Sequence, residues 1–132
     1  MKKIFLSLLT LISSLSAELN NEYLSKKLLN SNIPIVDIRT LKEWKETGIV
    51  KNSILIEFFT EKGNYNIPKF LAQLEAKVDT TKPFALICRT GSRTKILATF
   101  LSDTYNYRVI NITGGIMIHQ MKMANISLVP FK

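Results

Sequence analysis

The sequence has few of the residues that build disulfides and metal sites. Its 132 residues include one cysteine and one histidine. A single thiol excludes an intramolecular disulfide, so Cys88 is either a reactive thiol or a buried small side chain. One cysteine and one histidine are also too few soft ligands for a zinc site, so we expect no bound metal. No phosphate-binding or dinucleotide-binding glycine fingerprint occurs, which argues against a nucleotide site.

Repeats, low-complexity stretches and long apolar runs are missing as well. Without a repeat, a solenoid is excluded, and the 46% hydrophobic fraction is enough for one packed core. The length fits a single domain. An N-terminal apolar run spans twelve residues, 4–15. A membrane-spanning helix needs roughly 18 or more, so this run predicts no stable membrane insertion.

The apolar run belongs to a three-part pattern at the N-terminus. Two lysines precede it, and small residues follow it ahead of Glu18. This order is typical of a secretory signal peptide, although an uncleaved anchor or a buried helix is the alternative. We predict a signal peptide over 1–17, cleaved near Ser16 or Ala17, and a mature domain over 18–132. The mature domain is then periplasmic or secreted.

Acidic residues are scarce relative to basic ones. The chain carries 18 basic and 10 acidic side chains, a formal charge of +8. This excess favours an anionic partner, such as nucleic acid, membrane lipid or a small anion. The basic residues are scattered, and no basic stripe with interleaved aromatics appears. Because a nucleic-acid site needs clustered positive charge, we expect no nucleic-acid binding.

The remaining pattern alternates between strands and helices. We predict strands at 33–38, 54–59, 84–87 and 108–112, and helices at 21–29, 41–46, 70–76, 94–102 and 116–123. Such alternation predicts an α/β domain with a mainly parallel central sheet flanked by helices. Ligands of these sheets bind beyond the carboxyl ends of the strands, where Cys88 lies.

The segment around Cys88 concentrates features that favour an anion. A buried strand delivers the cysteine into a short turn, and a helix starts directly afterwards, so its N-terminus lends partial positive charge. Arg89 and Arg93 add permanent charge, which favours the nucleophilic thiolate. Gly91 lets backbone N–H groups converge on one point. These features predict a cradle for an anionic group attached to, or attacking, the Cys88 sulfur.

The motif Cys-Arg-Thr-Gly-Ser-Arg-Thr, starting at Cys88, resembles the active-site loop of rhodanese-like sulfurtransferases, in which a cysteine opens a six-residue loop. Further matching positions are Asp37 and Arg39, Glu43-Trp44 ahead of Gly48-Ile49, and the double glycine at 114–115. The resemblance covers residues 21–130. It implies the rhodanese-like three-layer fold, a cysteine persulfide intermediate, and no metal or organic cofactor.

The resemblance also implies roles for the loop. Cys88 is expected to be catalytic, and the substrate-binding residues are expected to be Arg89, Thr90, Gly91, Ser92 and Arg93. The expected reaction moves sulfur from a small anionic donor such as thiosulfate to cyanide or a thiol. A protein thiol is a compatible acceptor.

Two other functions fit parts of the pattern. A cysteine phosphatase or arsenate reductase places its arginine six positions after the cysteine, where this chain has Thr94. A rhodanese-fold module that only docks partners is the non-enzymatic alternative, and the intact cysteine argues against it. For the remaining conspicuous residues we expect a structural role for Asp37 and Arg39, a core position for Trp44, and a packing or surface position for His119.

Overall fold

The computed structural model describes residues 19–132, except for the side chains of residues 118–120. The predicted signal peptide therefore lies outside the described residues, as does the side chain of His119. No helix within the described range is long and apolar enough to cross a membrane.

The described chain forms one five-stranded sheet in the order β1-β5-β4-β2-β3. The strands are β1 (Leu19–Tyr23), β2 (Ile35–Asp37), β3 (Ile54–Leu55), β4 (Phe84–Ile87) and β5 (Val109–Thr113). All four neighbouring pairs are parallel. Parallel strands need crossover connections, which the intervening helices supply. The predicted α/β class and parallel sheet are confirmed.

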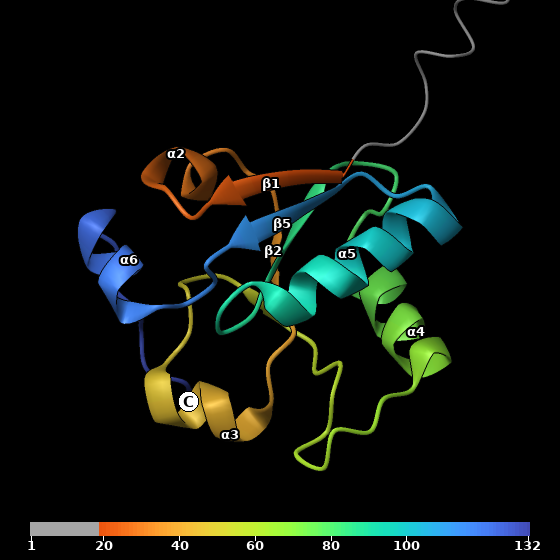
Figure 1. Ribbon diagram of the computed structural model, residues 1–132, viewed down its shortest axis with the longest axis horizontal. Helices are drawn as coiled ribbons and strands as arrows, with labels where there is room; N and C mark the ends of the chain where they lie inside the picture. The colour runs from red at the N-terminus through yellow and green to blue at the C-terminus, as the bar shows by residue number, and fades with distance from the viewer. Residues whose placement is uncertain (1–18) are drawn as a thin grey trace, which may run out of the picture.

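Helices cover both faces of this sheet. They are α2 (Lys26–Leu29), α3 (Leu41–Thr47), α4 (Ile67–Lys77), α5 (Ser92–Tyr105) and α6 (Ile118–Met123). Figure 1 shows α4 and α5 on one side of the sheet and α2 and α6 on the other. The result is the predicted three-layer arrangement, with a separate apolar core on each face.

Strand β4 explains where the cysteine points. Its residues are buried on both faces, and alternate side chains enter opposite cores. Phe84 and Leu86 join the core beneath α4 and α5, whereas Ala85 and Ile87 join the core beneath α2 and α6. Cys88 follows the same alternation and lies with Phe84 and Leu86. The strand therefore delivers the sulfur to the face that α5 covers.

The predicted helix at 21–29 is wrong in its first half. Residues 19–23 form β1, which pairs with β5 from Leu19↔Val109 to Tyr23↔Thr113, and the helix α2 has only four residues. β1 is an edge strand whose residues are mostly exposed, so it lacks the alternation that reveals a strand. Its pairing partner lies far along the chain, where local pattern gives no information.

Several other predicted boundaries shift, and three of these shifts bear on the region around the cysteine. The strand at 54–59 is regular only over Ile54–Leu55, although the N–H groups of Ile56 and Phe58 still donate to the carbonyls of Asp37 and Ile38. Helix α4 begins at Ile67, one residue ahead of Pro68. Helix α5 begins at Ser92 rather than at residue 94. Ser92 and Arg93 therefore belong to the first helical turn and not to the preceding loop.

Candidate active site

Cys88 lies directly after β4 with its side chain 0% exposed. Its Sγ atom accepts a hydrogen bond from the backbone N–H of Gly91 at 3.1 Å. The hydroxyl of Thr94 lies 3.5 Å from the same sulfur. These are the hydrogen-bond partners of the sulfur among the described residues, and neither is a base. The Gly91 N–H donates to the sulfur, and the Thr94 hydroxyl can either donate to it or accept from it.

Two glycines make room for this turn. Gly91 has φ +92°, a left-handed conformation that favours glycine, and a Cβ there would come within 2.8 Å of the Gly114 backbone nitrogen. Gly115 packs so closely that a Cβ would collide with the Cys88 carbonyl. The N–H of Ile116 donates to that carbonyl at 2.9 Å. The double glycine thus seats the loop against the end of β5.

The loop leads straight into α5, which is 14 residues long. Gly91 occupies the cap position, and no side chain accepts a hydrogen bond from the N–H groups of the first turn. An uncapped N-terminus of a long helix keeps its N–H groups and partial positive charge available to an anion. The nearby hydroxyls of Thr90 and Ser92 lie 3.1 Å apart and bond to one another.

The two loop arginines lie in different environments. Arg89 is exposed and has no hydrogen-bond or ion-pair partner among the described side chains. It lines a cavity of about 520 Å³ together with Thr90, and Ile116 and Met117 form an apolar part of the same wall. The same lining also includes the carboxylates of Glu43 and Glu46, neither of which forms an ion pair with Arg89.

Arg93, in contrast, is already paired. It donates to both carboxylate oxygens of Glu43, at 2.9 and 2.8 Å, and the two side chains are only 29% and 21% exposed. Burial raises the pKa of Glu43, but the hydrogen bond and charge of Arg93 outweigh it and hold that pKa below its usual value. The hydrogen bond from Arg93 to Glu43 raises the pKa of Arg93 in turn. Arg93, in the first turn of α5, is therefore paired, whereas Arg89, in the loop, has no ion-pair partner among the described side chains.

In the sequence, Glu43 was noted only as one of the positions of the family resemblance. In the structure it caps α3: the N–H of Glu43 donates to Thr40 Oγ1 at 3.2 Å, and the N–H of Thr40 donates back to Glu43 Oε1 at 3.4 Å. The same carboxylate holds Arg93, fifty positions further along the chain. Glu43 thereby joins the N-terminus of α3 to the first turn of α5.

Asp37 and Arg39 form a second ion pair that is almost fully buried. Arg39 donates from Nε to Asp37 Oδ1 at 3.0 Å and from Nη2 to Oδ2 at 2.9 Å. It also donates to Thr47 Oγ1 at 2.7 Å and to the Gly48 carbonyl at 2.8 Å. The bonds to Asp37 stay within the end of β2, and those to Thr47 and Gly48 tie it to the end of α3. This geometry supports the predicted structural role.

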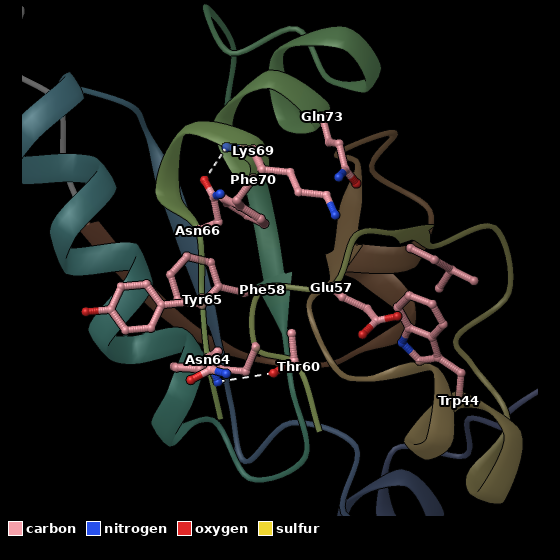
Figure 2. Close-up of a pocket in the computed structure, with 12 residues that line it drawn as sticks. Trp44, Glu57, Phe58, Thr60, Asn64, Tyr65, Asn66, Lys69, Phe70 and Gln73 are labelled. Atoms are coloured by element: carbon pink, nitrogen blue, oxygen red, sulfur yellow. Dashed lines mark hydrogen bonds between the residues drawn. The ribbon is translucent and has the colours of Figure 1, made fainter. Parts of the chain in front are cut away.

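A further cavity, of about 400 Å³, lies between α4 and the segment that follows β3. Figure 2 shows Lys69 and Gln73 of α4 on one side of it and Trp44 on another. None of residues 88–93 lines it. Trp44 is buried, as predicted, and its ring packs against Phe131 with centroids 5.8 Å apart. The chemistry of the cysteine loop is therefore separate from this cavity.

A buried polar group near the sulfur was missed by sequence reasoning. Thr94 is 0% exposed, and its hydroxyl bonds to Asn111 Oδ1 at 2.5 Å. Asn111 is 3% exposed and donates from Nδ2 to Asn21 Oδ1 at 3.0 Å. A polar residue in the middle of the apolar run of β5 was the available signal.

Comparison with known proteins agrees with this arrangement. A family model described as "Rhodanese-like domain" matches residues 20–118. The chain is 35% identical over 91 residues to the uncharacterized protein RP600 of Rickettsia prowazekii, covering 67% of this chain and 72% of that protein.

Among solved structures, a rhodanese-like domain protein from Staphylococcus aureus is similar with a TM-score of 0.61 and 21% identity, over 86% of this chain and 99% of that one. Rv0390 from M. tuberculosis is similar with a TM-score of 0.60 and 21% identity, over 74% of this chain and 80% of that one. At this level of identity, the likeness of these structures supports the fold alone.

The fold and the site together define a class: single α/β domains that present a buried cysteine at the carboxyl edge of a parallel sheet, beneath a helix N-terminus. Within that class the match over residues 20–118 is decisive. The chain belongs to the rhodanese-like domain family.

Proposed function

We propose that this protein is a sulfurtransferase that carries sulfur on Cys88 as a persulfide. The observation that supports this most strongly is the environment of the sulfur. It is buried, it accepts the Gly91 N–H at 3.1 Å, and it lies below the uncapped first turn of α5. Such a site stabilises negative charge on a small group attached to the sulfur.

The first step loads the cysteine. The Cys88 thiolate attacks the outer sulfur of thiosulfate, a new S–S bond forms, and the old S–S bond breaks with its electron pair leaving on sulfite. The outer sulfur of the persulfide then lies among the backbone N–H groups of residues 90–93. Arg89 is the cation that binds the donor and the departing sulfite, because its charge has no partner among the described side chains.

The second step unloads it. A cyanide ion or a thiolate attacks the outer sulfur of the persulfide, and the S–S bond breaks. Its electron pair returns to Cys88 Sγ, which regenerates the thiolate. A protein thiol is an acceptor of the same chemistry. One transfer is thus divided into two easier ones.

Arg93 acts as a positioning residue in this proposal. Its guanidinium is held by both oxygens of Glu43, so it fixes the first turn of α5 rather than reaching for a substrate. The same pairing weighs against phosphoryl transfer, which requires a free arginine to clamp the phosphoryl oxygens. Purified protein should therefore show negligible turnover of an aryl phosphate.

The test of the proposed function is thiocyanate production from thiosulfate and cyanide. We expect activity in the unmodified protein and none in Cys88→Ser, with the circular dichroism spectrum unchanged, since serine replaces a buried thiol of similar size. Appreciable thiocyanate production by the serine variant would contradict a covalent mechanism.

We also propose that the protein acts outside the cytoplasm, on the basis of the basic, apolar and small-residue order at 1–17. N-terminal sequencing of material from the native host tests this. We expect a first residue near position 17 or 18 in the exported fraction. An intact Met1 in the cytoplasmic fraction would contradict export.

A further inference from the structure

A chain of buried polar groups runs from the Cys88 sulfur to strand β1. Sγ lies 3.5 Å from Thr94 Oγ1, and either atom can be the donor. Thr94 Oγ1 bonds to Asn111 Oδ1 at 2.5 Å, and Asn111 Nδ2 donates to Asn21 Oδ1 at 3.0 Å. The sheet register places Asn21 directly opposite Asn111 on neighbouring strands. The sulfur is therefore connected to an exposed amide through two buried side chains.

Asn111 lies in an apolar layer. Its register partner on β4 is Leu86, and Val109, two positions earlier on the same face of β5, is buried in the same core as Leu86. Burying an amide costs free energy unless each of its polar atoms is bonded, so an apolar side chain would fill this position at lower cost. A role in packing alone does not account for an asparagine here.

The number of protons available in this chain of groups determines which acceptor receives the Thr94 hydroxyl proton. The Thr94 hydroxyl has one proton to donate and two lone pairs. It has three acceptors within reach: Asn111 Oδ1, the Gly91 carbonyl at 3.2 Å, and the Cys88 sulfur. While Cys88 is a thiol, its S–H can donate to Thr94, whose own proton then goes to Asn111. Once Cys88 is a thiolate, the sulfur only accepts, and Thr94 must turn its proton toward it.

Asn111 Oδ1 then needs another donor, and the two amides can supply it by turning over. Asn111 Nδ2 would donate to Thr94 Oγ1, and Asn21 Nδ2 would donate to Asn111 Oδ1. Amide oxygen and nitrogen have nearly the same size, so the heavy atoms keep their positions. Asn21 is exposed, so its amide turns without a buried barrier. The direction of every hydrogen bond in the chain is reversed, and no buried group loses its partner.

We propose that Thr94 is a further catalytic residue, which donates its hydroxyl proton to the Cys88 thiolate, and that Asn111 and Asn21 are positioning residues that hold it in this orientation. This inference rests on the proposed sulfur transfer. The donated bond matters whenever Sγ is charged: before it attacks the donor, and when the S–S bond of the persulfide breaks and the electron pair returns to Sγ.

The first test compares Thr94→Val with Thr94→Ser. Valine keeps the shape and removes the hydroxyl, whereas serine retains it. We expect valine to lower the thiolate-to-thiol ratio of Cys88 at fixed pH, measured by ultraviolet absorbance, about tenfold, as for one hydrogen bond to a charged group. It should slow the discharge of a preloaded persulfide to cyanide by a similar factor, and serine should restore both.

The second test uses an exposed residue, so that folding is not at risk. Asn21→Ala removes the outer amide, and Asn20→Ala is the matched control, because Asn20 is an exposed neighbour on β1 whose side chain points to the opposite face. We expect Asn21→Ala to lower the thiolate-to-thiol ratio about threefold and Asn20→Ala to leave it unchanged. In the Thr94→Val background, Asn21→Ala should have no further effect, because the two act through one pathway.

The outcomes distinguish a failure of the proposed role of Thr94 from a failure of the proposed sulfur transfer. If Thr94→Val retains the thiolate-to-thiol ratio and discharge rate of a protein that does form a persulfide, the role of Thr94 is wrong and sulfur transfer stands. If the Thr94→Val protein does not fold, the comparison of Asn21→Ala with Asn20→Ala decides. An equal thiolate-to-thiol ratio in these two variants would contradict the proposed roles of Thr94, Asn111 and Asn21. If the unmodified protein forms no persulfide from thiosulfate, the proposed function itself fails.

Discussion

Arg89 and Arg93 have the same side chain and belong to the same cysteine motif, yet the structure gives them opposite surroundings. Arg89 is exposed beside a cavity, with its charge unpaired among the described side chains. Arg93 is half-buried and holds both oxygens of Glu43. The comparison shows that a charge counted in a motif is not a charge available to a substrate. The partner of each arginine decides whether it binds a ligand or fixes the loop.

The largest effect should come from removing the arginine that does not meet the substrate. Arg93→Ala leaves Glu43 without its cation and releases the first turn of α5. We expect the free energy of unfolding to fall by about 1–2 kcal/mol, between the values for exposed and buried pairs. We expect kcat/KM for thiosulfate to fall about a hundredfold, since small displacements of positioned groups have effects of that order. Thermal unfolding and steady-state assays measure the two losses. An Arg93→Ala variant as stable as the unmodified protein would contradict the stabilising role of Arg93.

Removal of the exposed arginine should affect the substrate and not the fold. Arg89→Ala should lower kcat/KM for thiosulfate about tenfold, the effect of one charge-assisted hydrogen bond. The loss should shrink as salt is added, because an exposed charge is screened. With an uncharged sulfur donor the variant should match the unmodified protein. An equal loss with both donors would show that Arg89 has a structural role.

A third variant removes the charge that pairs with Arg93 while keeping Arg93 itself, and so tests whether pairing alone distinguishes the two arginines. Glu43→Gln removes the negative charge, and glutamine still accepts the hydrogen bond that caps α3. Arg93 then joins Arg89 as an uncompensated cation, so we expect KM for thiosulfate to fall about threefold while stability decreases slightly. An unchanged KM would mean that Arg93 points away from the donor whether or not it is paired.

The smallest effect is the pH dependence of the Glu43–Arg93 pair. The pKa of Glu43 is lower in the folded protein than its ordinary value of 4.5, so the folded state binds this proton more weakly than the unfolded state does. The stabilisation is therefore complete above the unfolded pKa, and it is lost as the pH falls through the folded pKa. The stability difference between the unmodified protein and Glu43→Gln should shrink on going from about pH 6 to about pH 3, by less than about 1 kcal/mol because the pair is partly exposed. Chemical denaturation at several pH values measures it, and a difference that grows at low pH would contradict the assigned direction.

Local signals in the sequence were sufficient to predict strand β4, the cysteine loop and helix α5. The run at 84–87, the cysteine and the following amphipathic pattern predicted β4, the loop and α5, because burial and helix periodicity are properties of neighbouring residues. In each case the residues that determine the structure lie within a few positions of one another.

Contacts between distant residues were not predictable in this way. β1 depends on pairing with β5, some ninety positions away, and its exposed residues carry no periodicity. The Arg93–Glu43 pair joins residues fifty positions apart, and Thr94 meets Asn111 across seventeen. The sequence therefore predicted that the cysteine lies between β4 and α5, but not which neighbouring charges and hydroxyls are already engaged there.

The central claim is that Cys88 carries sulfur, and mass spectrometry of the intact protein tests it most directly. After incubation with thiosulfate and removal of excess reagent, we expect the mass to increase by one sulfur atom, located on the peptide that contains Cys88 and lost again on addition of cyanide. Cys88→Ser should gain nothing under the same conditions. A protein that stays at its unmodified mass, or a serine variant that gains the same sulfur, would contradict the account.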